Sequence, residues 1–333
     1  MTFIDIQNAY ERIKTIVQRT PIVESNLLNS WLGHQILFKV ECLQTTGAFK
    51  LRGASNFIAK LAAQNALPER FVANSSGNHA QAVAYAAKHF DIPVTIYSSK
   101  NISAVKAAAT QYYGAELKLY DTRTEADAAV QLASEAPDTH WIPPFNHPDI
   151  IAGQGTAALE ALQDIKTNYK TTPDAVFAPC GGGGLVSGTL IATRHLAPQA
   201  RVMGVEPLAA NDAAESLRKG KICALESPAD TLADGAATPS VGEHTFVLLQ
   251  QLDGFYEVNE QDIAYWTQWL QHLLKLHIEP TCAMPMQGVV EWLRTQSRPK
   301  RVLVIVTGGN ISAQSMQKIW QYDHLLKPPS LLG

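Results

Sequence analysis

A single lysine, Lys50, stands in a run of small and apolar residues that follows a turn signal at Gly47. Apolar residues at helical spacing follow it, from Leu51 to Leu61, so Lys50 is predicted to open a helix. A lysine enclosed by apolar atoms loses hydration, its pKa falls, and the neutral amine becomes a nucleophile toward carbonyl groups. Most lysines at helix starts are solvated surface charges, so this residue alone is weak evidence for catalysis.

Two polar loops follow predicted strands, and parallel sheets bring such loops to one edge, where ligands bind. Residues 74–79 (NSSGNH) offer hydroxyls and N–H groups that suit a carboxylate or another anion. The alternative is plain helix capping, because Ser and Asn are preferred caps. Residues 307–310 (TGGN) end the last predicted strand. Thr307 would offer a hydroxyl to the same edge, or serve only as a turn residue.

A third loop, residues 180–185 (CGGGGL), lies between a predicted strand and a helix. Four consecutive glycines contribute no side-chain packing and cost backbone entropy, so we expect another group to approach the backbone closely. A phosphate held by N–H groups at a helix start meets this requirement, and a flexible turn is the alternative. The loop matches neither the Walker pattern nor a GxGxxG loop. An amine, a phosphate loop and a hydroxyl at one edge together fit pyridoxal phosphate.

Composition excludes several classes of protein. The 333 residues are 46% hydrophobic and 17% charged, as in ordinary globular enzymes. A net charge of −3 gives no field for binding nucleic acid or an anionic membrane. The sequence shows neither a secretory leader nor an apolar run long enough to span a bilayer, so we expect a cytoplasmic location. The four cysteines are far apart, which argues against a disulfide scaffold or a zinc site.

The chain alternates short β-rich runs with helical stretches, which predicts parallel sheets covered by helices on both faces. We expect two α/β domains with a site between them. A first helix is predicted over residues 5–18, and residues 141–155, rich in proline and then glycine, are expected to cross between the domains. Strands are predicted at 36–40, 71–73, 94–97, 117–120, 175–178, 202–205 and 302–306, and helices at 50–63, 79–89, 103–113 and 125–135.

Several motifs occur in the order typical of one enzyme family. They are residues 49–54 (FKLRGA), 75–79 (SSGNH), 151–156 (IAGQGT), 181–184 (GGGG), 233–235 (ADG), 279–280 (EP) and 308–310 (GGN). Over almost its whole length the chain closely resembles the serine/threonine dehydratase and serine racemase family of fold-type II pyridoxal phosphate enzymes. The resemblance implies two open parallel-sheet, three-layer α/β domains of the tryptophan synthase β-like fold. Residues 1–50 and 150–333 would form the large cofactor-binding domain, and residues 51–149 the small substrate-loop domain.

The resemblance also implies roles for individual residues. Lys50 would carry the cofactor as a Schiff base, Phe49 would pack by its ring, and Asn78 would bond the ring hydroxyl. Thr307 would bond the ring nitrogen; many relatives have serine there, so the hydroxyl is retained. The phosphate would be held by Gly181, Gly182, Gly183, Gly184 and Leu185.

A neutral hydroxyl leaves the ring nitrogen largely unprotonated, which tilts the expected chemistry toward elimination. Lys50, freed when the amino acid takes its place, would remove the α-proton as general base. Loss of the β-hydroxyl would then lead to a 2-oxo acid and ammonia. The substrate carboxylate would be held by Ser75, Ser76, Gly77, Asn78 and His79.

Ser76 bears on the choice between elimination and racemisation. Biosynthetic threonine dehydratases usually read Ser-Ala-Gly-Asn-His in this loop, whereas serine racemases and hydroxyaspartate dehydratases read Ser-Ser-Gly-Asn-His, as this chain does. Racemisation needs a second acid/base opposite Lys50, and Ser76 could serve as one or could bind carboxylate. The gating arginine of mammalian serine racemases corresponds to Asp127 here, which argues against racemisation, and Arg123 is out of register.

Residues 206–212 (EPLAAND) resemble the metal loop of racemase-type relatives. Carboxylates of Glu206 and Asp212, with the carbonyl of Ala210, would offer hard oxygen ligands to Mg²⁺ or Ca²⁺. Waters would complete the shell. The alternative is a carboxylate at a strand end followed by a helix cap at Asp212.

The sequence thus predicts a pyridoxal phosphate-dependent lyase that converts L-threonine or L-serine to 2-oxobutanoate or pyruvate and ammonia. The alternative is a serine racemase or a threo-3-hydroxyaspartate dehydratase. More distant readings are a β-replacing transferase of the cysteine synthase type, whose substrate loop is missing, and a non-catalytic cofactor-binding protein. The sequence shows no added regulatory domain of the biosynthetic type, which favours a catabolic role. Relatives are commonly dimeric, so we expect a homodimer with an amino-acid substrate.

Overall fold

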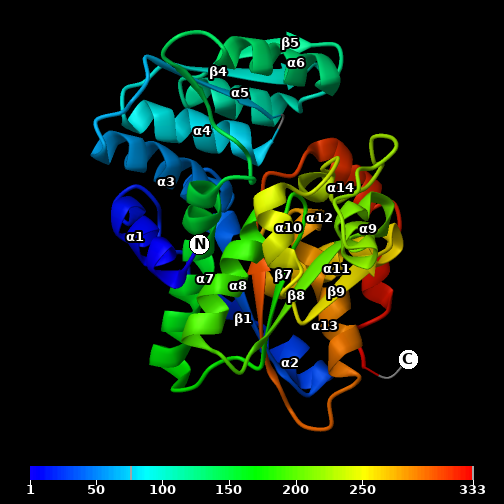
Figure 1. Cartoon of the computed structure of the whole chain (residues 1–333). Helices are drawn as coiled ribbons and strands as arrows, with labels where there is room; N and C mark the ends of the chain where they lie inside the picture. The colour runs from blue at the N-terminus through cyan, green and yellow to red at the C-terminus, as the bar shows by residue number, and fades with distance from the viewer. Residues whose placement is uncertain (76, 332–333) are drawn as a thin grey trace.

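The computed structural model describes residues 1–75 and 77–331, and its strands form two sheets (Figure 1). The larger sheet has six strands in the order β1-β2-β10-β7-β8-β9, and the smaller has four in the order β5-β4-β3-β6. In this part of the chain, neighbouring strands are parallel except for β1, which runs antiparallel to β2. The predicted α/β fold with two parallel-sheet domains is confirmed.

Where the sequence predicted an element, the bounds in the structure agree closely with the prediction, apart from the first helix. The strands are β1 Ile22–Glu24, β2 Gln35–Val40, β3 Arg70–Asn74, β4 Val94–Ser99, β5 Glu116–Tyr120, β6 Thr139–Trp141, β7 Ala175–Pro179, β8 Arg201–Pro207, β9 Gly254–Val258 and β10 Arg301–Val306. The helices are α1 Phe3–Ile13, α2 Asn26–Leu32, α3 Lys50–Ala63, α4 Asn78–His89, α5 Ala104–Tyr112, α6 Arg123–Ser134, α7 Pro148–Tyr169, α8 Gly184–Leu196, α9 Asp212–Lys219, α10 Glu243–Leu249, α11 Glu260–Leu274, α12 Pro280–Ala283, α13 Pro285–Leu293 and α14 Ala313–Ile319. Short 3-10 turns lie at Glu41–Leu43, Leu208–Ala210, Asp234–Ala236 and His324–Leu326.

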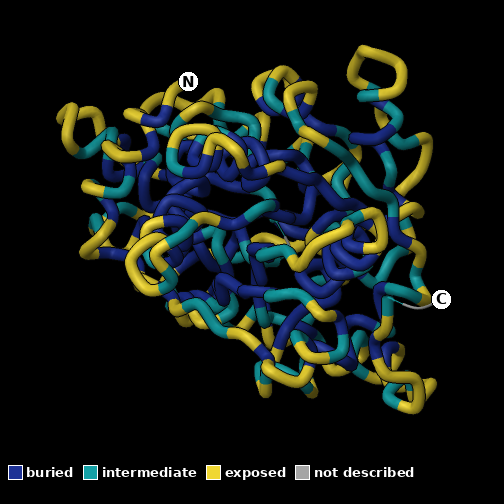
Figure 2. Tube along the Cα trace, turned by 90° about the horizontal axis from the view of Figure 1, so that it is seen from below, coloured by how far each residue is buried: buried dark blue, intermediate teal, exposed yellow. Residues whose placement is uncertain are grey.

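Both sheets are covered on both faces. In β10, Val302 and Val304 pack in a core with α11, α12 and α13, whereas Leu303 and Ile305 pack with α1, α7 and α8. This alternation follows from the two-residue period of a strand. The smaller sheet carries α3 and α4 on one face and α6 on the other. Figure 2 shows buried segments in the interior and exposed segments at the periphery. No helix in the described ranges is both long and apolar enough to cross a membrane.

Two details of the sequence prediction are wrong. The first helix ends at Ile13 rather than near residue 18. Tertiary hydrogen bonds take Gln18 out of the helix, because its N–H donates to Gln44 and its carbonyl accepts from Gln44 and Arg52. The glycine-rich part of residues 141–155 does not form a crossing loop either. It continues helix α7 instead.

Glycines in α7 let three helices meet closely. A Cβ on Gly153 would lie 2.4 Å from the backbone oxygen of Arg52 in α3. A Cβ on Gly188 in α8 would lie 2.6 Å from the Cα of Gly155. Glycine inside a helix lowers helix stability by about 1 kcal/mol relative to alanine. The close packing of the three helices offsets this loss. We call the part built on the six-stranded sheet the larger part and the part built on the four-stranded sheet the smaller part. Helix α3 joins α7 and α1 of the larger part to α4 of the smaller part (Figure 1).

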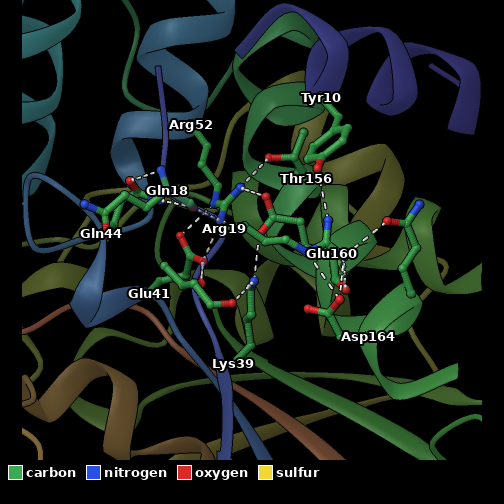
Figure 3. A network of polar contacts seen from close by, with 12 residues as sticks. Tyr10, Gln18, Arg19, Lys39, Glu41, Gln44, Arg52, Thr156, Glu160 and Asp164 are labelled. Atoms are coloured by element: carbon green, nitrogen blue, oxygen red, sulfur yellow. Dashed lines mark hydrogen bonds and ion pairs between the residues drawn. The ribbon is translucent and has the colours of Figure 1, made fainter. Parts of the chain in front are cut away.

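A buried ion network lies beneath the start of α3 (Figure 3). The Nε of Arg52 is 2.7 Å from Oε2 of Glu41, and its Nη2 is 2.8 Å from Oε2 of Glu160. Lys39 on β2 adds a second cation, with its Nζ 2.6 Å from Oε2 of Glu160. None of these four side chains is more than 1% exposed. Two cations and two carboxylates therefore join α3, β2 and α7 in one network.

Pairing favours the charged forms of Arg52 and Glu41 despite their burial, whereas burial lowers the pKa of Lys39. Burial lowers the pKa of Arg52, but the carboxylates of Glu41 and Glu160 outweigh burial and raise it. Burial likewise raises the pKa of Glu41, but Arg52 and Lys39 outweigh it and hold that pKa below its usual range. Lys50 stands two residues before Arg52, so the network fixes the backbone that carries Lys50.

Replacing Arg52 by methionine is expected to lower the free energy of unfolding by about 3–5 kcal/mol, because two buried carboxylates would face one remaining cation. Urea unfolding would measure the loss. The matched control is Arg19→Met, which removes a partly exposed pair with Asp164 and should cost less than about 1 kcal/mol. Equal losses for the two variants would contradict the role given to the network.

Candidate functional site

Lys50 is the first residue of α3, as the sequence predicted. Its Nζ donates a hydrogen bond to the carbonyl of Pro144 at 2.7 Å. Burial of the amine lowers the pKa of Lys50 to about 8. The preceding residue, Phe49, donates its backbone N–H to the carbonyl of Thr307 at 3.0 Å, which ties the lysine to the end of β10.

The amine of Lys50 faces a cavity of about 190 Å³ at the carboxyl ends of strands from both sheets. This is the edge at which parallel sheets bind ligands. A smaller cavity of about 40 Å³ adjoins it, and Lys50 and Thr307 line both. The other predicted site residues that line the larger cavity are Phe49, Ser75, Gly77, Asn78 and His79. The predicted phosphate residues, Gly181, Gly182, Gly183, Gly184 and Leu185, line the smaller one.

The tetraglycine begins helix α8 and packs against protein atoms as well as lining the cavity. A Cβ on Gly182 would lie 2.3 Å from the ring of Phe145, and one on Gly184 would lie 2.4 Å from Oε1 of Gln154. Gly183 has a φ of +87°, a conformation that favours glycine. The expectation that these glycines have no packing role is therefore incomplete, because part of the close approach comes from the protein itself.

The start of α8 is suited to an anion. Its first turn carries no acidic residue, and no side chain caps it. The first N–H groups of a helix have no acceptor within the helix, and the helix dipole favours negative charge there. The donors, the small cavity and the position beside Lys50 fit a phosphate joined to a ring.

Asn78 is held in place by two residues on distant elements. Its Nδ2 lies 2.8 Å from Oε1 of Glu279, and its Oδ1 accepts from Nδ2 of Asn310 at 2.8 Å. Burial, and next the charge of Asp234, raise the pKa of Glu279. Sequence reasoning gave Glu279 no role, although its motif was part of the family pattern. The two contacts join the start of α4 to the start of α12 and to the loop after β10.

The predicted carboxylate loop precedes α4. The N-cap of α4 is Gly77, which offers no capping side chain, and its N–H donates to Oγ of Ser75 at 3.1 Å. His79 is buried, and its Nε2 lies 3.0 Å from the carbonyl of Ile142. Burial, and next the charge of Lys50, lower the pKa of His79 to about 3, so its ring is neutral. Ser76, the predicted second acid/base, lies outside the described residues.

Two cations that line the cavity were not predicted as site residues, although the sequence placed Arg123 near the gating position. Nζ of Lys106 on α5 lies 2.9 Å from Oδ2 of Asp234, and Nη1 of Arg123 donates to the carbonyl of Ala237 at 3.3 Å. Both contacts connect the smaller part of the molecule to residues 234–237 of the larger part. Asp127, which the resemblance predicts at the position of the racemases' gating arginine, accepts from Nδ2 of Asn74 at 2.6 Å. A lysine within an alanine-rich helix gives no sequence signal of such a position.

None of residues 206–212, the predicted metal loop, lines either cavity. Glu206 is fully buried, and its carboxylate accepts from the N–H groups of Ala214 at 2.7 Å and Ala213 at 3.2 Å. Burial raises the pKa of Glu206 to about 9 and that of Asp212 to about 7. Among the described residues, no cluster of three or more His, Cys, Asp or Glu side chains could hold a metal.

The sequence model of a family described as "Pyridoxal-phosphate dependent enzyme" matches residues 13–308. The chain belongs to this family. L-threo-3-hydroxyaspartate ammonia-lyase of Saccharomyces cerevisiae is 41% identical over 313 residues, which cover 93% of each protein. Serine racemase of Schizosaccharomyces pombe is 36% identical over 329 residues, which cover 98% of this chain and 97% of the relative.

The crystal structure of a threonine deaminase from T.th. superimposes with a TM-score of 0.87 at 38% identity. The match covers 94% of this chain and 99% of that one. The fold is therefore the tryptophan synthase β-like fold of fold-type II enzymes. The protein is a pyridoxal phosphate-dependent enzyme of the ammonia-lyase and racemase family.

The site fits this cofactor at each end. Lys50 offers an amine of lowered pKa to the aldehyde, and the start of α8 offers N–H donors to the phosphate. Thr307, at the end of β10, lines both cavities and would meet the ring nitrogen, with Phe49 and Asn78 beside the ring. These individual roles stay predictions.

Because burial lowers the pKa of Lys50 to about 8, the cofactor-free protein should bind pyridoxal phosphate covalently at a rate that rises with pH and levels off above about 8. Below that pH the amine is protonated and is not a nucleophile; above it the amine is neutral. The visible absorbance band after rapid mixing would report the rate. A lysine with the ordinary pKa of 10.5 would instead still gain about tenfold per pH unit near pH 9, and such a rise would contradict the enclosed amine.

Proposed function

We propose that this protein is an ammonia-lyase that removes the β-hydroxyl and the amine of a hydroxy amino acid, with L-threo-3-hydroxyaspartate as its preferred substrate. The observation that carries the proposal is Lys50, whose amine has a lowered pKa and which lines two adjoining cavities together with Thr307. The carboxylate loop lines the larger cavity, and the glycine loop lines the smaller one. The sequence favours L-serine or L-threonine. The 41% identity to the hydroxyaspartate ammonia-lyase of yeast supports hydroxyaspartate, the alternative substrate, better than serine or threonine.

Bound pyridoxal phosphate would supply an aldehyde for the substrate amine and a ring that withdraws electrons from the α-carbon. Lys50 would take the α-proton, and Ser75 with the start of α4 would orient the substrate carboxylate. Thr307 would present a neutral hydroxyl, which favours elimination. The β-hydroxyl leaves with a proton as water, and hydrolysis of the released enamine gives the 2-oxo acid and ammonia. Hydroxyaspartate would give oxaloacetate, serine pyruvate and threonine 2-oxobutanoate.

Serine racemisation is the second candidate function. The serine racemase of Schizosaccharomyces pombe, 36% identical, and the SSGNH loop support it. Asp127 argues against racemisation, because this acidic side chain lines the cavity where a serine racemase would be expected to carry an arginine. The expected homodimer also stays a proposal, which light scattering of the holoenzyme would test.

Changing Lys50 to Ala should abolish the visible absorbance band and lower turnover at least about 1,000-fold, because the amine that binds the cofactor and moves the proton is lost. The assay follows 2-oxo acid and D-amino acid from L-threo-3-hydroxyaspartate, L-serine and L-threonine. Lys60→Ala, on the same helix in an ion pair with Asp149, is the control and should retain activity. If turnover is highest with L-serine or L-threonine, hydroxyaspartate is not the preferred substrate. If D-serine is the main product, the protein is a racemase.

We also propose a Mg²⁺ or Ca²⁺ site formed by Glu206, Asp212 and the carbonyl of Ala210. Both carboxylate oxygens of Asp212 are buried, and the backbone N–H groups of Val241 and Asp212 lie near them without making a well-aligned hydrogen bond. Burial raises the pKa of both carboxyl groups, and the nearby charge of Asp212 adds to the rise for Glu206. No Lys, Arg or His side chain contributes to either shift. Hard oxygen ligands of this kind suit either ion.

Saturating Mg²⁺ or Ca²⁺ is expected to raise the melting temperature of the wild type by about 3–8 °C, because a ligand that binds only the folded state stabilises it. Asp212→Asn should lose this rise, since one anionic ligand is gone. Asp121→Asn, which breaks an exposed ion pair with Lys100, should retain it. The same rise in both variants would reject the site.

A further inference from the structure

A substrate with two carboxylates needs a second cation in the cavity. The first carboxylate is assigned to the loop before α4. Among the described residues that line the larger cavity, the Lys and Arg side chains are Lys50, Lys106 and Arg123. Lys50 is taken by the cofactor, so the choice lies between Lys106 and Arg123.

Lys106 lies deep in the cavity, next to the carboxylate loop. Its side chain is 8% exposed, and a Cβ on Gly77 would lie 3.8 Å from its Nζ. A charge enclosed in this way interacts more strongly with an anion than one in water does. The two carboxylates of hydroxyaspartate stand on adjacent carbons, so a cation beside the first carboxylate site is placed to bind the second.

Arg123 lies at the rim. Its side chain is 60% exposed, its Nε is 3.8 Å from the carboxylate of Asp127, and its Nη1 is bound to a backbone carbonyl. Water and salt weaken a contact made at such a position. Arg123 is therefore the weaker candidate of the two.

The ammonium of Lys106 remains charged and can exchange its partner. Burial lowers the pKa of Lys106, but the charges of Asp234 and Glu279 outweigh burial and raise it. Asp234 has a side chain that is 54% exposed, so it can turn into water when another carboxylate binds the ammonium. Glu279 is buried beside Asn78.

We propose that Lys106 binds the side-chain carboxylate of a dicarboxylic amino acid and selects it over serine and threonine, with Asp234 as the counter-ion that the substrate displaces. The inference rests on the proposed function, because it gives hydroxyaspartate its second anchor. Lys106 is then a specificity-determining residue.

The competing explanation is a structural one. The ion pair joins α5 to residues 234–236 of the larger part, so it could serve only to hold the two parts of the molecule together. Loss of a structural contact would weaken all amino acids alike. Loss of a carboxylate site would weaken only those with a second carboxylate.

The test is the equilibrium binding of L-aspartate and L-alanine to the holoenzyme, followed by the shift of the cofactor's absorbance. Neither amino acid has a β-hydroxyl to eliminate, and only L-aspartate has the second carboxylate. Lys106→Met should raise the Kd of L-aspartate about 30-fold or more, as expected when one partner of a desolvated charge pair is removed. The Kd of L-alanine should change less than about threefold. Lys106→Arg should recover most of the aspartate affinity.

Two further variants keep the test decisive if Lys106→Met does not fold. Asp234→Asn, at a half-exposed position, should tighten L-aspartate several-fold, because it removes the competing carboxylate. Arg123→Met should leave the aspartate-to-alanine preference unchanged, and so should the exposed control Lys100→Met.

Equal losses for both amino acids in Lys106→Met, or weaker aspartate binding in Asp234→Asn, would overturn the proposal in favour of a structural pair. Loss of the preference in Arg123→Met would assign the site to Arg123 instead. Failure of the proposed function is a separate result. If the wild type prefers L-aspartate through Lys106 yet does not convert hydroxyaspartate, the proposed reaction is wrong and the carboxylate site stands.

Discussion

The position of Lys50 depends on charges that lie beneath it. Arg52, two residues further on, pairs with Glu41 at the end of β2 and with Glu160 in α7. Buried charges that lose a partner are costly, so the three elements are held together at this point. Helix α3 therefore begins at a fixed place in the larger part while the rest of it packs against α4. The reactive lysine sits where the two parts of the molecule join.

Close backbone contacts complete this arrangement. Gly153 lets α7 approach α3, and Gly155 with Gly188 lets α7 approach α8. The same helix thus sets the distance between Lys50, at the start of α3, and the glycine loop, at the start of α8. A cofactor that must reach an amine at one end and a phosphate site at the other needs this distance to be constant. Rigid helices provide it better than loops would.

Local sequence was sufficient for the features that repeat along the chain. A continuous apolar run, residues 302–306, marked β10, and the helix from Lys50 to Ala63 was predicted with its bounds. The polar loops lie at one edge because parallel strands end there. The antiparallel β1, the helical course of residues 148–155 and the end of α1 were not predicted, since contacts with distant segments decide them.

The sequence by itself determined the α/β class, the lysine, the glycine loop and the family, because each is written in short segments with their own geometry. Only the tertiary structure decided the electrostatic environment of the site. The partners of Lys106 and Asn78 are Asp234 and Glu279, more than a hundred residues away. Burial in the folded protein lowers the pKa of Lys50. Charge and desolvation depend on which groups meet in space, and no local pattern records that.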